Sequence, residues 1–195
     1  MILILFLLFL IAPDLHANQK SVYDLISNNK NLSIFKKYLD INGLDDVLKK
    51  KIPYNWTIYA PSNIAFENIP NELKDTILND KYYSKRLFTD HILTKQIVSS
   101  QLSDEIVTEL TVSNKPIKLY KIENLHIKDV VVVKKDIIAD NGVIHIIDCV
   151  MFIQPSEQDS RLTFNLKNEF PITSCCMRTS DEVKLWKLNT KQIIY

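Results

Sequence analysis

The segment Asn141-Gly142-Val143-Ile144-His145-Ile146-Ile147-Asp148 begins with a turn signal and continues as a strand that is apolar on both faces. Such a strand is typical of the centre of a sheet, where both faces are buried. Strand alternation places His145 on one face and Asp148 on the other. A buried imidazole or carboxylate needs hydrogen-bond partners, because burying it unpaired is costly. We therefore expect the two polar residues to be either a structural lock, which joins elements by hydrogen bonds, or a functional site.

Composition narrows the possible functions. The chain has 195 residues, of which 46% are hydrophobic and 24% charged, as in ordinary soluble domains. A net charge of +1 gives no reason to expect a nucleic-acid partner. The sequence contains only two glycines, Gly43 and Gly142. This count excludes a P-loop, a dinucleotide-binding fingerprint and a Gly-x-Ser-x-Gly nucleophile elbow, since each needs more closely spaced glycines.

The amino-terminal segment has the features of an export signal. Residues 1–11 are uninterruptedly apolar and are followed by Pro13. This run is too short to span a bilayer, which takes about 20 residues. It predicts a signal peptide over residues 1–17, cleaved before Asn18, with an uncleaved short anchor as the alternative. We therefore expect a secreted, periplasmic or cell-surface protein that has no integral membrane span after signal cleavage.

Export places the cysteines in an oxidising compartment. The chain has three, Cys149 in the apolar strand and the adjacent pair Cys175 and Cys176. Cys149 is expected to be a small core residue. One of the adjacent pair can form a disulfide with Cys149 or with a second copy of the chain. The sequence does not choose between these pairings, and it leaves the oligomeric state open.

Hydrophobic periodicity changes along the chain. Apolar residues at helical spacing predict helices over 22–26, 33–41, 44–48, 73–78 and 83–92. Period-two runs predict strands over 56–60, 106–112, 117–121, 125–127, 130–133 and 143–153. Helices followed mainly by strands indicate an α+β domain. Residues 156–195 do not show this hydrophobic periodicity and are assigned to a carboxy-terminal extension of unknown structure.

Three segments together resemble the fasciclin-like domain family. Residues 57–66, Thr-Ile-Tyr-Ala-Pro-Ser-Asn-Ile-Ala-Phe, resemble its first signature, and residues 141–148 resemble its second. Between them, residues 87–102 are similar to the central segment of the family. The resemblance extends from Ser21 to Gln154. It implies a fasciclin-like β-sandwich wedge with N-terminal helices packed around it, which we assign to residues 18–155.

The resemblance also implies an exported adhesion or interaction module without catalytic residues or cofactors. Its partner would be a surface or matrix protein or a glycan. By analogy with the central segment of the family, the candidate partner-binding residues lie within residues 83–102 and are Tyr83, His91, Ile92 and Leu93. Asp90 precedes His91 where many members have tyrosine. Because that tyrosine–histidine pair is implicated in integrin binding by animal members, we do not expect an animal-type integrin role.

The polar residues of the two signatures favour a structural lock over a site. We expect Asp148 to accept hydrogen bonds from the turn at Ser62 and Asn63, with His145 as a further member of the lock. The alternative is a periplasmic small-ligand or metal-binding protein that uses His91, His145 and Asp148 as ligands or as an acid/base group. The chain lacks HExxH, CxxC and similar short ligand signatures, so no metal site is predicted.

Overall fold

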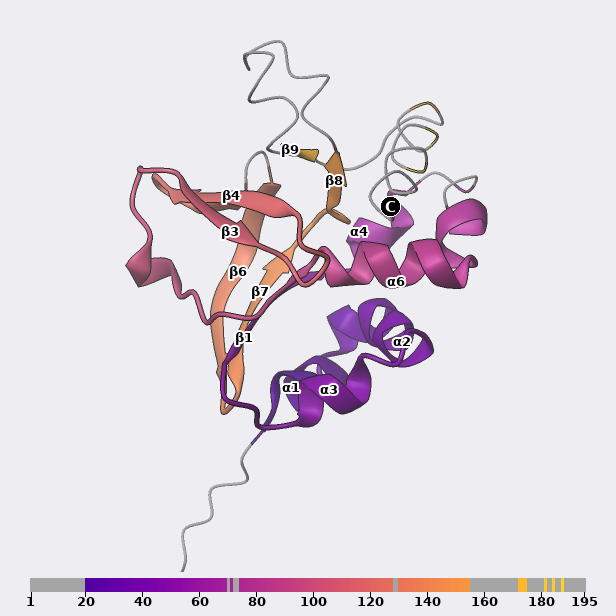
Figure 1. The fold of residues 1–195 in the computed structure, drawn as a ribbon, viewed down its shortest axis with the longest axis horizontal. Helices are drawn as coiled ribbons and strands as arrows, with labels where there is room; N and C mark the ends of the chain where they lie inside the picture. The colour runs from indigo at the N-terminus through magenta and orange to yellow at the C-terminus, as the bar shows by residue number, and fades with distance from the viewer. Residues whose placement is uncertain are drawn as a thin grey trace, which may run out of the picture.

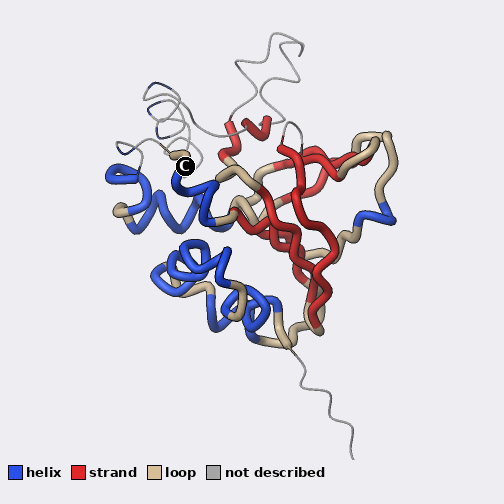
Figure 2. The backbone as a smooth tube through the Cα atoms, turned by 180° about the vertical axis from the view of Figure 1, so that it is seen from behind, coloured by secondary structure: helices blue, strands red, loops and turns tan. Residues whose placement is uncertain are grey.

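The computed structural model describes residues 20–69, 71, 74–127, 130–154, 172–174, 181, 184 and 187. Apart from one short helical turn at Ser99–Gln101, the helices are grouped on one side and the strands on the other (Figures 1 and 2). The α+β prediction is therefore confirmed. The predicted signal peptide and most of residues 156–195 lie outside the described residues.

The described elements follow the expected order. The helical elements are α1 (Val22–Ser27), η1 (Lys30–Leu32), α2 (Ser33–Ile41), α3 (Asp45–Lys49), α4 (Asn63–Glu67), the π-helical turn η2 (Lys74–Leu78), α6 (Lys81–Thr89) and η3 (Ser99–Gln101). The strands are β1 (Trp56–Pro61), β2 (Ile92–Leu93), β3 (Val107–Leu110), β4 (Pro116–Lys121), β5 (Leu125–Ile127), β6 (Val130–Ala139), β7 (Gly142–Ile147), β8 (Phe152–Gln154) and β9 (Ile172–Ser174).

Three predicted boundaries are wrong by three residues or more. The helix predicted over 83–92 is α6, which ends at Thr89. The strand predicted over 143–153 ends at Ile147, and β8 forms a separate two-stranded sheet with β9. The strand predicted over 130–133 continues to Ala139, through a polar stretch in which two register shifts bend β6. A β-bulge tolerates such a break in alternation, which a simple period-two pattern cannot show.

Seven strands form one sheet in the order β2-β1-β7-β6-β5-β4-β3. β1 and β7 are parallel, and the other neighbouring pairs are antiparallel. A bridge between Leu93 and Thr111 connects the two edges, so the sheet nearly closes on itself. Bent at β6, the sheet forms two facing halves, which matches the predicted sandwich wedge.

β7 is an interior strand of the sheet, between β1 and β6, as its apolar sequence predicts. All six of its residues are buried. Ile144 and Ile146 pack in the core between the sheet and the helices, whereas Ile147 packs in the core inside the folded sheet. The same alternation continues beyond the strand, because Val150 joins the first core and Met151 the second. β7 therefore separates two apolar cores and belongs to both.

Gly142 permits the parallel pairing of β7 with β1. It lies opposite Trp56 in the register, and a Cβ at this position would lie 2.3 Å from the Trp56 carbonyl oxygen. Such contact with backbone atoms cannot be relieved by a side-chain rotation. The glycine of the Asn-Gly turn is therefore required by packing against β1.

Candidate functional site

His145 joins three segments through its two ring nitrogens. The backbone N–H of Asp136 donates to Nδ1 at 3.2 Å, so Nδ1 carries no proton. Nε2 lies 2.8 Å from the carbonyl oxygen of Ile97, which can only accept, so Nε2 carries the proton. Burial lowers the pKa of His145, in agreement with a neutral ring. The side chain acts as a neutral cross-link between β7, β6 and the segment before η3.

Two further side chains fasten the same segment. The Asp136 carboxylate accepts hydrogen bonds from the N–H and the hydroxyl of Ser99. Burial alone would raise the pKa of this carboxyl, but the two Ser99 donors outweigh it and the pKa is lowered. In β1, the Thr57 hydroxyl accepts from the Ile97 N–H at 2.9 Å and donates to the Lys95 carbonyl. Residues 95–99 are thus held to three strands.

His91 makes an equivalent cross-link at the end of α6. Its Nδ1 lies 2.9 Å from the Leu87 carbonyl oxygen and therefore donates. Its Nε2 accepts from the Met151 N–H at 2.8 Å. The ring is fully buried, and this burial lowers its pKa from 6.5 to about 4. His91 joins the end of α6 to the chain that follows β7.

Asp90 forms a buried ion pair that the sequence did not suggest. Its Oδ2 lies 2.8 Å from the Lys115 Nζ, and the two side chains are 0% and 3% exposed. The Ser113 hydroxyl donates to Oδ1. A carboxylate at a helix C-terminus is unfavourable with the helix dipole, and the Lys115 ammonium offsets it. The pair ties α6 to the turn between β3 and β4.

Ser62 and Asn63 also make cross-links, but not to Asp148. The Ser62 backbone N–H donates to the Ile147 carbonyl at 2.9 Å, which joins the two signature segments. The Asn63 Oδ1 accepts from the Ile34 N–H at 3.0 Å, and its Nδ2 donates to the Lys30 carbonyl. α2 has no side-chain cap of its own. Asn63 therefore caps α2 from a distant part of the sequence.

The expectation of a buried Asp148 is wrong. β7 ends at Ile147, and the bend that follows leaves Asp148 exposed to solvent. At the other end of β7, Asn141 is 3% exposed, so the buried polar residues of this segment are Asn141 and His145. Its Oδ1 accepts from the Val22 N–H at 2.8 Å, and its Nδ2 donates to the carbonyls of Leu48 and Lys50. From the sequence, Asn141 is interpreted only as a turn residue. We infer that its hydrogen bonds stabilise the fold more than any made by Asp148.

The predicted partner-binding residues are all in the interior. Tyr83, His91, Ile92 and Leu93 are 5%, 0%, 2% and 1% exposed. The chain turns here from the buried face of α6 into β2, whose pairing with β1 places it within the sheet. The Lys187 Nζ also lies 4.9 Å from the Tyr83 ring centroid. These four side chains cannot form a contact surface in this fold, and that prediction is corrected.

The alternative metal site is not supported. His91 and His145 each use both ring nitrogens for backbone contacts, and Asp148 is exposed. Within the described residues, no cluster of three or more His, Cys, Asp or Glu side chains could hold a metal ion. Cys149 is 3% exposed and disulfide-bonded, while Cys175 and Cys176 lie outside the described residues. The described part of the chain contains no helix with the length and hydropathy of a membrane span.

We predict that replacing Asn141 destabilises the protein much more than replacing Asp148. Asn141→Ala leaves three backbone groups without their partner, two of them buried and one partly buried, at a cost of about 2–4 kcal/mol in the free energy of unfolding. Asp148→Ala changes an exposed side chain and is expected to cost no more than about 0.5 kcal/mol. Denaturant unfolding of the two variants measures both values. Equal destabilisation would contradict the assignment.

The buried histidines predict a loss of stability in acid. The pKa of His91 is about 4 in the folded state against about 6.5 when unfolded, so below pH 6.5 the unfolded chain binds more protons. The free energy of unfolding is expected to fall by on the order of 2 kcal/mol between pH 7 and pH 5. His145 contributes in the same direction.

Denaturant titrations at several pH values test this dependence. His91→Gln is expected to be less stable at pH 7 and to show a shallower fall in acid. An identical pH dependence in the wild type and in this variant would show that His91 does not cause it.

Comparisons with known proteins agree with the signature segments. Residues 30–154 match the fasciclin domain family model. The chain is 26% identical over 137 residues to human periostin, covering 69% of this chain and 16% of periostin. It is 31% identical over 122 residues to the transforming growth factor-beta-induced protein ig-h3 of Sus scrofa, covering 55% of this chain and 16% of that protein. It is 26% identical over 133 residues to the uncharacterized protein sll1735 of Synechocystis, covering 68% of this chain and 98% of that protein.

A solved FAS1 domain pair from the insect cell adhesion molecule fasciclin I is also similar, with a TM-score of 0.48 and 24% identity over 62% of this chain and 44% of that one. The family match covers well over half of the sequence and includes both signature segments. The chain therefore belongs to the fasciclin domain family.

Proposed function

We propose that this protein is an exported, non-enzymatic interaction module that binds a surface or matrix protein or a glycan. Membership of the fasciclin domain family supports a general adhesion or interaction role. The internal use of both buried histidines agrees with such a role, because their nitrogens are engaged in holding the fold together. The residues that contact a partner are therefore expected among the exposed side chains of the domain.

The observation that carries this proposal is an apolar area on the outer face of the sheet. We call it the outer-sheet patch, and its members are Ile106, Tyr120, Ile122, His126, Val131 and Val133. Register defines it, because Tyr120 pairs with His126 and His126 with Val131. Ile106 directly precedes β3, whose first residue, Val107, lies opposite Leu119. Ile122 and Val133 extend the patch beyond the ends of these pairs.

Four members of the outer-sheet patch are exposed aliphatic side chains, and Tyr120 and His126 are half-buried. Ile106, Ile122 and Val133 are 61%, 68% and 56% exposed. The rings of Tyr120 and His126 stack with centroids 4.9 Å apart and planes within 2° of parallel. Contiguous exposed apolar side chains commonly mark interaction sites, and flat aromatic groups suit them because they lose little entropy on binding.

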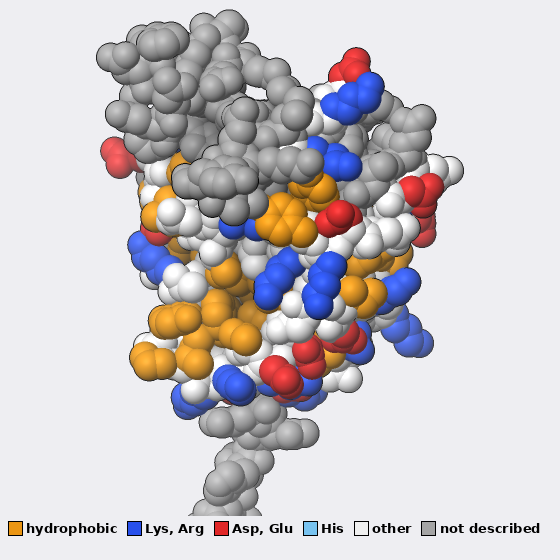
Figure 3. Space-filling model, turned by 45° about the vertical axis from the view of Figure 1, so that its right-hand side comes forward, with side chains coloured by type: hydrophobic (Ala, Val, Ile, Leu, Met, Phe, Trp, Pro, Cys, Tyr) orange, Lys and Arg blue, Asp and Glu red, His pale blue; other side chains and the backbone are white. Residues whose placement is uncertain are grey.

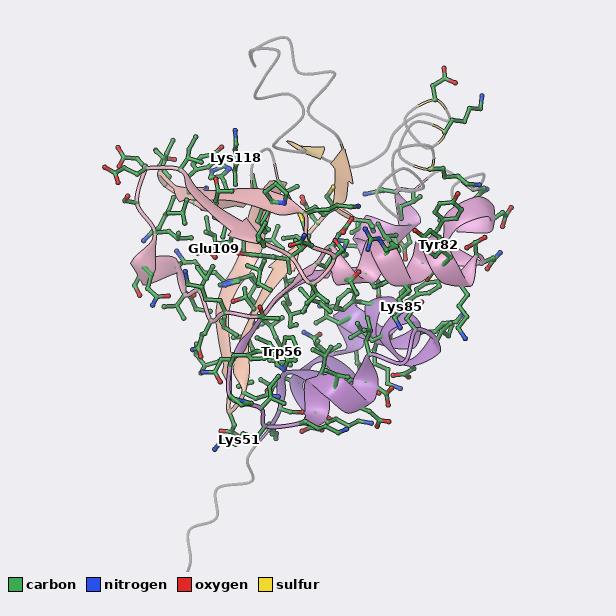
Figure 4. All side chains as sticks on the ribbon, in the orientation of Figure 1. Lys51, Trp56, Tyr82, Lys85, Glu109 and Lys118 are labelled. Atoms are coloured by element: carbon green, nitrogen blue, oxygen red, sulfur yellow. The ribbon has the colours of Figure 1, made fainter. Side chains whose placement is uncertain are left out.

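The arrangement of elements places this patch away from the helices. The β3–β4 end of the sheet lies opposite the helical side (Figure 1). The labelled side chains Glu109 and Lys118 mark the strand side, whereas Tyr82 and Lys85 mark α6 (Figure 4). A partner on the outer-sheet patch would therefore meet strands and turns, with the helical side left accessible.

We predict that charges introduced into the outer-sheet patch abolish partner binding without unfolding the protein. Binding of the full chain to immobilised matrix proteins, cells and glycan arrays is measured first. Val133→Glu and Ile106→Glu are expected to weaken that binding at least about tenfold, since a buried unpaired charge is costly at an interface. Their melting temperatures should stay close to that of the wild type.

Ile64→Glu is the matched control, because Ile64 is 64% exposed on α4 at the helical side. It should bind as the wild type does. Equal binding by all three variants, or selective loss in Ile64→Glu, would reject the outer-sheet patch as the contact surface.

Export is tested separately. The proposal predicts that the protein recovered outside the cytoplasm of its source cells begins at Asn18, because residues 1–17 are removed. Intact-mass measurement and amino-terminal sequencing decide this. A protein that retains residues 1–17, or that remains in the cytoplasm, would contradict the proposal of a cleaved signal.

A further inference from the structure

A pocket of about 260 Å³ lies on the helical side, where α2, α4 and the π-helical turn η2 meet. Its lining residues are Ile34, Lys37, Tyr38, Phe66, Glu67, Lys74 and Leu78. No residue of the outer-sheet patch contributes to it. π-Helical turns are rare and occur frequently at functional sites. The pocket is therefore a candidate site independent of the proposed adhesive surface.

The body of the pocket is aromatic and aliphatic. Tyr38 and Phe66 stack with ring centroids 6.0 Å apart, and Phe88 supports Tyr38 from behind at 5.1 Å. Phe66 and Leu78 are 2% and 7% exposed, so the wall belongs to the packed core and is preformed. An engineered apolar cavity of about 150 Å³ binds benzene. By volume, this pocket accommodates a group somewhat larger than a single ring.

The charged groups of the pocket favour an anion. Lys37 is exposed, with its Nζ 5.7 Å from the Tyr38 ring centroid. Lys74 is half-buried and donates to the backbone carbonyl of Glu67 at 3.3 Å. Two ammonium groups against the single Glu67 carboxylate leave the lining with an excess positive charge. Lysine and arginine side chains lie between apolar areas on this side of the molecule (Figure 3).

We propose that this pocket binds small amphipathic anions, with an aromatic or branched aliphatic body against the half-buried Ile34 and Tyr38 and one carboxylate or sulfonate near Lys37 and Lys74. The apolar wall supplies contact area and the lysines orient the ligand. This division of roles is usual in small-molecule sites. Ligand binding here would be a second activity of the domain and does not depend on the proposed adhesion.

Titration of the full chain with 2-naphthoate tests the proposal, by calorimetry or by chemical-shift changes. Saturable binding is expected, with weaker binding of the cationic analogue 2-naphthylmethylammonium. Ile34→Trp fills the pocket and should weaken 2-naphthoate binding at least about tenfold. Lys37→Glu and Lys74→Glu should each weaken it about three- to fivefold, and Glu67→Gln should strengthen it about twofold.

Lys51→Glu is the control for the charge changes, because Lys51 is exposed, does not line the pocket and lies at the lower end of the domain in Figure 4. It should leave the affinity unchanged. Melting curves show whether each variant is folded. If Ile34→Trp does not fold, the lysine variants alone test the proposal. Absence of saturable binding at millimolar concentrations, or equal binding of the cationic analogue, would overturn the proposal. The proposal would also be overturned if Lys51→Glu weakened 2-naphthoate binding as much as Lys37→Glu does.

Discussion

The parallel pairing of β1 with β7 is the constraint on which the rest of the fold depends. Residues far apart in the sequence meet here in a six-residue register from Trp56–Gly142 to Pro61–Ile147. The close approach at Gly142 makes the pairing possible, and Asn141 then fastens α1 and α3 to the same end of the strand. At the other end, the Ser62 N–H continues the ladder to Ile147 and leads directly into α4. Two apolar cores form on the two faces of this central pair.

Buried polar groups stabilise the segments that regular pairing does not reach. His145, Asp136 and Thr57 hold residues 95–99, and His91 holds the chain beyond β7. In each case the side chain bonds to backbone groups that would otherwise be buried without partners. Such neutral, fully engaged histidines act as structural residues. The buried signature residues are therefore structural. The candidate functional residues are those of the outer-sheet patch and of the pocket between α2, α4 and η2.

Several features could be predicted from local patterns, because they depend on nearest neighbours in the sequence. The central position of β7 followed from its apolar faces, and the helix–strand order followed from periodicity. The length of β6 could not be predicted in this way. Lys134 and Lys135 interrupt the apolar alternation, and the bulges that carry the strand past them depend on pairing with β7. Similarly, nothing local to Asp90 indicates that it faces Lys115, 25 residues away.

The sequence by itself determined the family, the α+β class and the central strand, since signature residues and hydrophobic alternation are properties of short segments. Only the tertiary structure decided which polar residues are buried and what they contact. β7 ends at Ile147, six residues before the predicted end of the strand, and this places Asp148 in solvent, while Asn141 at the preceding turn is enclosed by α1 and α3. The tertiary structure also buried Tyr83, His91, Ile92 and Leu93, and it brought the separate strands of the outer-sheet patch together. The exposure of a side chain and the contacts between distant segments depend on long-range packing. They therefore follow from the folded chain and cannot be predicted from its separate segments.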